Sequence, residues 1–294
     1  MKLFDLFFLI IQKTLPKKLL TKIFGKIASC RGWPSYLLKH TFKFAYKINM
    51  AEAAYKELKL YPDLNGLFTR RLAPQYRPQP IDSSIFSSPA DGRLAQLGKI
   101  ENCSLIQAKG IYYNLASLMA GDLELVKPFQ QGGNFSCIYL APHNYHRVHM
   151  PFDGTLVGAR YISGELFSVN KRTTASIKNL YCKNERVVLL FENKTRYFSL
   201  IFVGACLVGG IAVILPSLQG DVQTHIPGLE WTTEFQPQLV MTSQISRGSE
   251  IGYFYFGSTV ILLTSRDCPD WLPTLEKDTL VRVGDPLAGP AISR

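Results

Sequence analysis

Basic and apolar residues repeat with helical spacing near the start of the chain. Lys18, Lys22 and Lys26 recur every four residues and would span one helix face of roughly 80°. The apolar residues of this stretch fall on the other side: Leu19, Leu20, Ile23, Phe24 and Ile27. A later stretch repeats the pattern, with Lys39, Lys43 and Lys47 beside Leu37, Leu38, Phe44 and Tyr46. Residues 1–60 are therefore predicted to form amphipathic helices.

The pattern becomes that of β-strands from about residue 86. Short apolar runs alternate with Gly, Asn and Asp, which favour turns; the runs cover residues 136–140, 155–161, 187–191 and 251–263. A basic, proline-bounded stretch at 68–78 joins the two parts and is predicted to be irregular. The fold class is therefore predicted to be α+β, with an N-terminal amphipathic helical module at 1–60 and a β-rich domain at 61–294.

Residues 197–220 carry no charge and are long enough to cross a bilayer as a helix. The Gly209–Gly210 pair and the β-branched residues favour two buried strands joined by a tight bend. Neither end of the segment is strongly basic, unlike the flanks of an anchored span. We predict two strands here, with a membrane span as the alternative. The apolar stretch at 3–11 is too short to span a bilayer.

Positive charge is concentrated in the helical module. The net charge of the chain is +11, and residues 1–50 hold nine Lys and Arg31 against one acid, Asp5, a net charge of +9. A basic arm can bind nucleic acid or an anionic membrane. The apolar helix faces favour the membrane surface, where basic amphipathic helices lie in the interface. We therefore expect an anionic membrane partner and no nucleic acid, with docking on the chain's own domain as the alternative.

The composition excludes several classes of protein. Hydrophobic residues make up 47% of the chain and charged residues 19%, which excludes intrinsic disorder. The six cysteines never occur as C-x-x-C, so a zinc ribbon and a disulfide scaffold are not expected. We expect reduced and mostly buried thiols.

Three polar positions are candidates for chemistry. Three of the five histidines lie close together, at His143, His146 and His149. Their spacing alone leaves metal binding, acid–base catalysis and a structural role open. Asp91 precedes Gly92, a pair that by itself predicts a hairpin turn. Ser258 follows Gly257 inside an apolar run, where a polar interruption is costly unless it is used.

Taken together, these segments resemble the phosphatidylserine decarboxylases of the bacterial membrane-associated type. The resemblance covers almost the whole chain, and one position departs from it, because Phe256 stands where Leu is commonest. The matching segments are residues 89–92 (Pro-Ala-Asp-Gly), 109–115 (Lys-Gly-Ile-Tyr-Tyr-Asn-Leu), 145–151 (Tyr-His-Arg-Val-His-Met-Pro), 164–170 (Gly-Glu-Leu-Phe-Ser-Val-Asn), 184–186 (Asn-Glu-Arg), 203–205 (Val-Gly-Ala) and 256–259 (Phe-Gly-Ser-Thr).

The resemblance implies that the chain cleaves itself between Gly257 and Ser258. Cleavage would give a β chain, 1–257, and an α chain, 258–294, whose first residue becomes a pyruvoyl cofactor made from Ser258. By the same resemblance His149 is the base that activates Ser258, and Asp91 orients His149. His146 would orient the substrate or donate a proton. His143 lies outside the matched core and has no assigned role.

The implied reaction is decarboxylation of phosphatidylserine to phosphatidylethanolamine, a step of phospholipid biosynthesis, through a Schiff base to the pyruvoyl group. The resemblance also implies peripheral association with the cytoplasmic face of the inner membrane, an association of the β and α chains, a homodimer, and no metal. Three alternatives remain: an uncleaved Ser-His-Asp lipid hydrolase, a zinc enzyme built on the three clustered histidines, and a membrane adaptor without catalysis.

Overall fold

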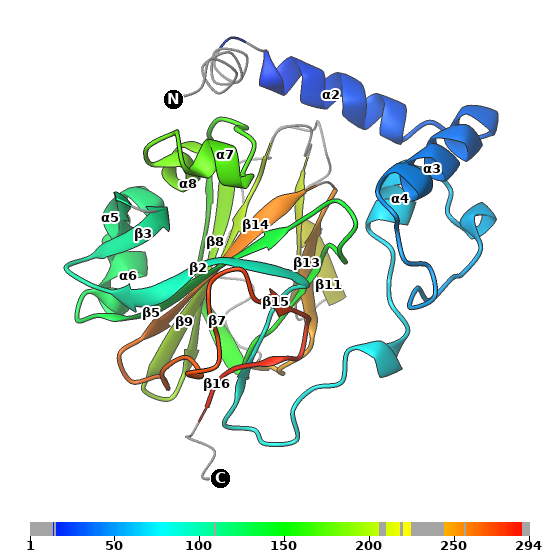
Figure 1. The fold of residues 1–294 in the computed structure, drawn as a ribbon. Coiled ribbons are helices and arrows are strands. Elements are labelled where there is room, and N and C mark those ends of the chain that lie inside the picture. The colour runs from blue at the N-terminus through cyan, green and yellow to red at the C-terminus, as the bar shows by residue number, and fades with distance from the viewer. Residues whose placement is uncertain are drawn as a thin grey trace.

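The computed structural model describes residues 14, 16–108, 110–205, 210–217, 220–224, 244–255 and 257–289. Helices at the N-terminal end lead into two antiparallel sheets (Figure 1). The predicted α+β class is therefore confirmed at the level of secondary structure.

The described part of the N-terminal module is helical over residues 17–28 and 33–45, as predicted. The prediction is wrong for residues 46–57, which form turns and bends and an isolated bridge between Ala53 and Leu72. The elements of the module are α2 (Lys17–Ala28), α3 (Trp33–Ala45) and the 3₁₀ turn η1 (Leu58–Leu60), and it is followed by α4 (Leu64–Phe68) and the 3₁₀ turn η2 (Pro74–Tyr76). Gly32 separates α2 from α3 with a φ of 75°, a left-handed conformation that glycine adopts readily. The 3₁₀ turn η2 is the only regular element described between α4 and residue 78, which agrees with the irregular arm expected there.

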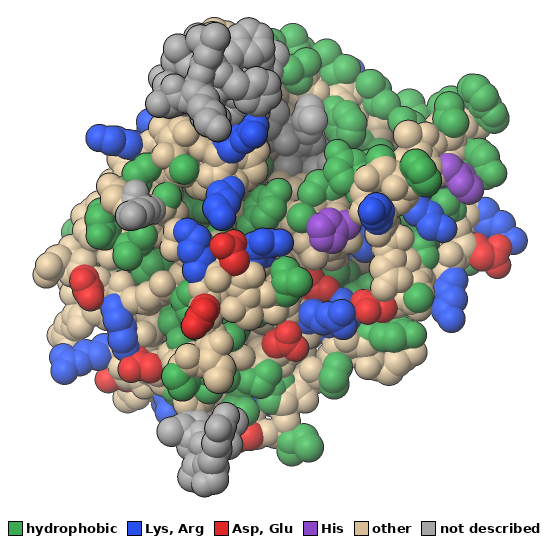
Figure 2. All heavy atoms as spheres, in the orientation of Figure 1, with side chains coloured by type: hydrophobic (Ala, Val, Ile, Leu, Met, Phe, Trp, Pro, Cys, Tyr) green, Lys and Arg blue, Asp and Glu red, His purple; other side chains and the backbone are tan. Residues whose placement is uncertain are grey.

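Many apolar side chains of α2 and α3 face outward, although Phe24 and Phe42 pack against the core. Leu19, Ile23 and Ile27 of α2 are exposed, and on α3 the exposed fractions reach 76% for Trp33 and 88% for Phe44. Figure 2 shows hydrophobic side chains gathered over these two helices at the upper right of the molecule. Docking on the chain's own domain therefore leaves much of this apolar surface uncovered.

One lysine of the predicted basic face points inward instead. Lys39 is buried, and its Nζ donates hydrogen bonds to the carbonyl oxygens of Leu58, at 3.0 Å, and Tyr61. Lys43 and Lys47 are exposed, as the pattern predicted. The prediction of an exposed basic face is therefore confirmed for Lys43 and Lys47 and wrong for Lys39. The Lys39 side chain instead stabilises the η1 turn.

The larger sheet has eight antiparallel strands, in the order β12-β7-β8-β9-β14-β5-β2-β15. Their bounds are Gln244–Ile245, Gly154–Ile162, Arg186–Asn193, Arg196–Val203, Ser258–Ser265, Gly133–Leu140, Gly92–Ile100 and Leu280–Val281. Strand β14 is central and pairs with β9 on one side and β5 on the other. All eight residues of β14 are buried, so both of its faces lie in a core.

The smaller sheet has four strands, in the order β11-β10-β13-β6. Their bounds are Gly220–Thr224, Ile211–Ser217, Glu250–Phe254 and Arg147–His149. Two ribbons pair β1 (Phe86–Ser87) with β16 (Pro286–Ala288), and β3 (Ser104–Ala108) with β4 (Ile111–Asn114). The short helical elements are α5 (Leu115–Leu118), α6 (Leu123–Val126), η3 (Lys127–Phe129), α7 (Lys171–Thr174) and α8 (Leu180–Lys183).

The uncharged segment at 197–220 forms strands, as predicted. Strand β9 belongs to the larger sheet and β10 to the smaller one, so the segment passes from one sheet to the other. The bend expected at Gly209–Gly210 lies partly outside the described residues, because 206–209 are not described. Over the described parts of the chain, no helix combines the length and apolar character needed to cross a bilayer.

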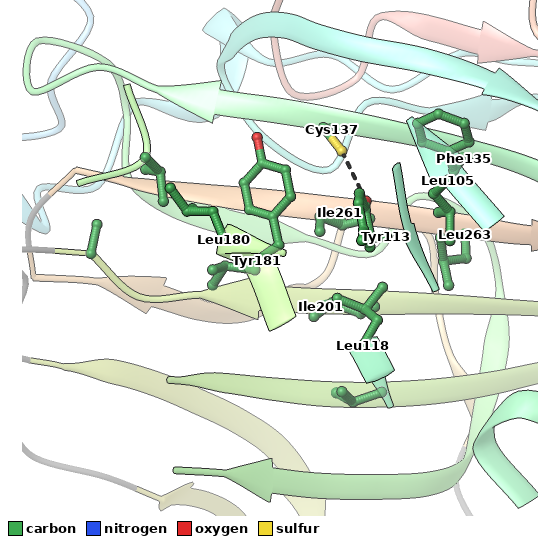
Figure 3. Close-up of a cluster of buried hydrophobic side chains, with 14 of the residues drawn as sticks. Leu105, Tyr113, Leu118, Phe135, Cys137, Leu180, Tyr181, Ile201, Ile261 and Leu263 are labelled. Carbon is green, nitrogen blue, oxygen red and sulfur yellow. Dashed lines mark hydrogen bonds between the residues drawn. The ribbon is translucent and has the colours of Figure 1, made fainter. Parts of the chain in front are cut away.

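Hydrophobic side chains fill both faces of the larger sheet. Alternate residues of β14 point in opposite directions, so Ile261 belongs to one core cluster and Leu262 to the other. Figure 3 shows the first cluster, where the Tyr113 hydroxyl lies 3.7 Å from the Cys137 sulfur. Burial raises the pKa of the Cys137 thiol to about 12, so it stays protonated.

The described cysteines are free thiols, but they are not uniformly buried. Cys137 and Cys268 are buried and Cys103 and Cys182 are half-buried, whereas Cys30 is exposed at the end of α2. The expectation of mostly buried thiols is therefore wrong for Cys30. Cys206 lies outside the described residues.

Candidate active site

The Ser258 hydroxyl is buried at the point where the chain passes from the smaller sheet to the larger one. Ser258 is the first residue of β14 and lies opposite Leu140 on β5. Its Oγ has no hydrogen-bond partner among the described residues. An unpaired buried hydroxyl is costly, by about 1–3 kcal/mol. This cost is consistent with a hydroxyl that is retained for chemistry.

Gly257, immediately before it, is not in the left-handed conformation. A Cβ added at this position would meet the Leu140 carbonyl oxygen at 3.5 Å, an ordinary contact. This contact therefore does not by itself require glycine in this conformation. The absence of a side chain still leaves the Gly257 carbonyl carbon sterically open to attack.

His146 is fully buried and carries an unpartnered nitrogen. Its Nδ1 lies 2.9 Å from the Asn144 carbonyl oxygen, which can only accept, so Nδ1 carries the proton. Burial lowers the pKa of His146 to about 3, so the ring is neutral and Nε2 presents a lone pair. This Nε2 has no partner among the described residues, and the ring packs on Phe68 with centroids 4.0 Å apart. The backbone of Leu140, the residue paired with Ser258, acts in the opposite direction and raises the pKa of His146.

His149 lies on β6 and uses both of its ring nitrogens. Nδ1 is 2.7 Å from the Gly248 carbonyl oxygen and therefore donates, and Nε2 is 3.0 Å from the Tyr145 hydroxyl. Burial lowers the pKa of His149, which favours the neutral ring. In that state Nε2 accepts from Tyr145, so this hydroxyl covers the lone pair that would receive a proton. The His149 amide donates to the Pro89 carbonyl oxygen at 2.8 Å, which ties β6 to the segment before Asp91.

Asp91 is buried in a bend that leads into β2. It does not form the hairpin turn that its sequence alone predicts, because β2 pairs with β5 and β15 and not with the preceding strand. Its carboxylate accepts hydrogen bonds from the Arg77 side chain, with Nε at 2.9 Å, and from the Val283 amide at 2.9 Å. Arg77 also pairs with Glu52 at 2.9 Å. In this conformation Asp91 is hydrogen-bonded to Arg77 and not to His149.

A cavity of about 230 Å³ opens beside Asp91. Its lining includes Arg70, Arg77, His143 and Tyr145. His143, which the sequence left unassigned, therefore lies at this cavity, whereas His146, His149 and Ser258 are not among the residues that line it. The structure brings Asp91 and the histidine segment together around the cavity edge.

The sequence did not point to Arg70, Arg77 and Tyr145 as site residues. Two of them belong to the basic, proline-bounded arm, whose charge was the available signal, and Tyr145 lies within the clustered-histidine segment. The described residues contain no group of three His, Cys, Asp or Glu side chains that could hold a metal ion.

Comparison with known proteins identifies the family of this chain. The family model described as phosphatidylserine decarboxylase matches residues 64–289. A phosphatidylserine decarboxylase proenzyme of Idiomarina loihiensis is 38% identical over 278 residues, which is 94% of each chain. The proenzyme of Pseudomonas entomophila is 37% identical over 285 residues, covering 97% of this chain and 98% of the relative. That of Shewanella baltica is 38% identical over 280 residues, covering 95% and 94%. Over nearly its whole length, the chain therefore belongs to the phosphatidylserine decarboxylase family.

Proposed function

We propose that this chain is a self-processing decarboxylase that converts phosphatidylserine to phosphatidylethanolamine with a pyruvoyl group made from Ser258. Family membership supports the reaction, and the relatives' name of proenzyme supports processing. The observation that carries the proposal is the buried, unpartnered Ser258 hydroxyl directly after Gly257, at the start of a strand buried on both faces.

Maturation is proposed to begin at the Gly257–Ser258 peptide bond. Ser258 Oγ adds to the Gly257 carbonyl carbon as its proton passes to a base, and the C–N bond breaks to leave an ester and a free amine. Loss of the residue 258 Cα proton then breaks the Cβ–O bond and releases the Gly257 carboxylate. Water replaces the nitrogen of the remaining dehydroalanine, ammonia leaves, and the α chain begins with a pyruvoyl group.

Side chains of this protein are proposed to accept and donate the protons that the two reactions transfer. His149 Nε2 takes the Ser258 proton once the Tyr145 hydroxyl has moved away, and Asp91 orients this ring after exchanging partners with Arg77. The neutral His146 Nε2 accepts a hydrogen bond or a proton from the substrate amine and can return it. A pyruvoyl group at residue 258 would supply the electrophilic carbonyl for the substrate amine and the electron sink that loss of CO₂ requires.

The two chains are proposed to stay associated after cleavage. The α chain would contain β14, β15 and β16. Strand β14 pairs with β5 from Ser258 to Ser265 and with β9 from Thr259 to Thr264, and both neighbours belong to the β chain. Removing a central strand would expose two ladders of backbone polar groups. The homodimer remains a prediction of the family resemblance.

The direct test of the function is a decarboxylation assay with a carbonyl reagent. Purified protein given short-chain phosphatidylserine should release CO₂ and phosphatidylethanolamine in equal amounts. Hydroxylamine should abolish turnover, because it reacts with the ketone of a pyruvoyl group, and it should shift the α-chain mass by one adduct. Activity that survives full treatment, with no adduct on the fragment, would contradict the proposed cofactor.

The N-terminal helices are proposed to hold the enzyme at the cytoplasmic face of the inner membrane. Leu19, Ile23 and Ile27 are exposed beside the exposed row Lys18, Lys22 and Lys26. Apolar side chains can enter the interface while lysines contact anionic headgroups, each contributing on the order of 1 kcal/mol. This arrangement would bring the cavity to a substrate that stays in the bilayer.

Vesicle binding should therefore have a salt-sensitive part and a salt-resistant part. Raising the salt from about 0.1 M to about 1 M shortens the Debye length from roughly 10 Å to 3 Å, and should release only part of the protein in a flotation assay. K18Q/K22Q/K26Q should increase that release and leave self-cleavage intact. The matched control is K127Q/K194Q/K277Q, which removes three exposed lysines of the β-rich domain. Binding that ignores both salt and lipid charge would contradict the electrostatic contribution.

A further inference from the structure

Arg70 is a buried cation without a carboxylate partner among the described residues. Its exposed fraction is 3%, and it lines the cavity beside Asp91. Its Nη2 donates to the carbonyl oxygen of His143 at 3.2 Å and lies 3.5 Å from that of Asn144. Its Nε and Nη1 have no acceptor in the described part of the chain. A buried charge is costly unless a counter-ion and hydrogen bonds compensate it.

The other cations of the cavity do have carboxylate neighbours. Arg77 lies between Asp91 and Glu52 and hydrogen-bonds both. Arg282 has its Nη1 3.7 Å from Glu52, and its side chain is largely exposed. The cavity lining therefore contains three arginines and two carboxylates. Asp91 and Glu52 act on Arg70 only at longer range, and no described carboxylate forms an ion pair with it. Among the described residues, no anionic group contacts the Arg70 guanidinium directly.

We propose that Arg70 binds the phosphodiester of the phospholipid headgroup. This inference rests on the proposed function, which supplies a substrate with two anionic groups, a phosphodiester and a carboxylate. A cation held against the carboxylate would stabilise the ground state and oppose the loss of CO₂. The phosphodiester is unchanged between substrate and product, so its contact with Arg70 can hold the headgroup throughout the reaction.

The position of the cavity agrees with a lipid headgroup. Its lining includes Asn49 and Glu52, which follow α3, and Asp91 and Gly92, at the start of β2. The headgroup site therefore lies between the helical module proposed to contact the bilayer and the β-rich domain that carries Ser258. The exposed His143 lines the same cavity and offers a further ring nitrogen.

The test measures binding and does not depend on cleavage or decarboxylation. In the uncleavable Ser258→Ala background, dihexanoyl phosphatidylethanolamine and dihexanoyl phosphatidylserine are titrated below their micelle concentrations by calorimetry. Both contain the phosphodiester, and only the second contains the carboxylate. Adding Arg70→Gln should weaken both by about tenfold or more, because a charge-assisted contact is lost. The matched control is Arg93→Gln, an exposed arginine that pairs with Asp278 outside the cavity lining, which should change binding by less than about twofold.

Two probes identify the group that is recognised. The neutral methyl phosphotriester of the ethanolamine lipid, titrated against the parental protein, should bind about tenfold more weakly than the diester. This comparison needs no variant, so it decides the matter even if Arg70→Gln does not fold. Inorganic phosphate should bind more weakly than either lipid, since it lacks the glycerol and amine portions.

The proposal is overturned if the triester binds as well as the diester, or if a folded Arg70→Gln protein keeps full affinity for both lipids. Binding of the serine lipid alone would assign the cavity to the carboxylate, and preferential binding of inorganic phosphate would make it a free-phosphate site. Either result overturns the proposal. A chain that binds both lipids through Arg70 but never decarboxylates them would instead sink the proposed function and leave this site intact.

Discussion

Replacing Ser258 with alanine should leave the chain whole. The wild-type protein should separate under denaturing conditions into a 257-residue fragment and a 37-residue fragment with a blocked N-terminus, because residues 258–294 follow the proposed scissile bond. Ser258→Ala removes the nucleophile, so intact mass spectrometry should find a single species near 33.1 kDa and no turnover. The variant should fold normally, since it removes a buried hydroxyl that has no partner among the described residues.

The neighbouring residue supplies the matched control. Thr259 is also buried, and its Oγ1 likewise has no partner among the described residues. Thr259→Val removes that hydroxyl and keeps the shape of the side chain, and it should cleave at the wild-type rate. A wild-type protein that stays at full mass and still decarboxylates would contradict the maturation scheme. A single uncleaved band with lipid hydrolysis would instead favour a conventional serine hydrolase.

His149 and His146 should separate into a processing role and a turnover role. His149→Ala should slow self-cleavage by about 10²- to 10⁴-fold, the usual contribution of a general base. Asp91→Asn should also slow cleavage, because the orientation of His149 would be lost. His146→Ala should still cleave but turn over poorly. The exposed His40, on α3, provides the control, and His40→Ala should affect neither step.

The surroundings of the two Nε2 atoms differ, so the two assignments can be told apart. The lone pair without a described partner belongs to His146, while His149 Nε2 lies against the Tyr145 hydroxyl. If His146→Ala blocks processing and His149→Ala processes normally, the two roles are reversed and the uncovered nitrogen is the base. Cleavage can be followed in a cell-free translation stopped with denaturant at timed intervals, and turnover is then measured on the processed enzyme.

The pH dependence of cleavage gives an independent check within the same experiment. Burial lowers the pKa of His149 below its ordinary 6.5, so the basic form of the ring survives as the pH falls through that value. The cleavage rate should therefore stay level from about pH 8 to about 6.5 and decline only below, where the ring gains its proton. A rate that has already halved at pH 6.5 would show a base without this shift.

Local patterns were enough for the types of the main elements. The four-residue repeat of Lys18, Lys22 and Lys26 predicted a helix, because side chains at this spacing share one face whatever lies nearby. The β-branched residues and the Gly209–Gly210 pair predicted strands at 197–220, and β9 and β10 are present there. The family resemblance identified the motifs that hold Asp91, His149 and Ser258, because each motif is contiguous in sequence.

Sequence by itself therefore determined the element types, the α+β class, the family and the candidate Ser258, and only the tertiary structure decided which groups meet. Asp91 meets Arg77, from an irregular arm that has no periodicity to predict its path. Lys39 turns inward because the carbonyl oxygens of Leu58 and Tyr61 accept from it. Strand β14 lies between β9 and β5 through pairings of distant segments, which depend on register rather than on local pattern. The physical reason is the same in each case: a side chain's partner is fixed by long-range packing, whereas its helix or strand is largely favoured by its neighbours in sequence.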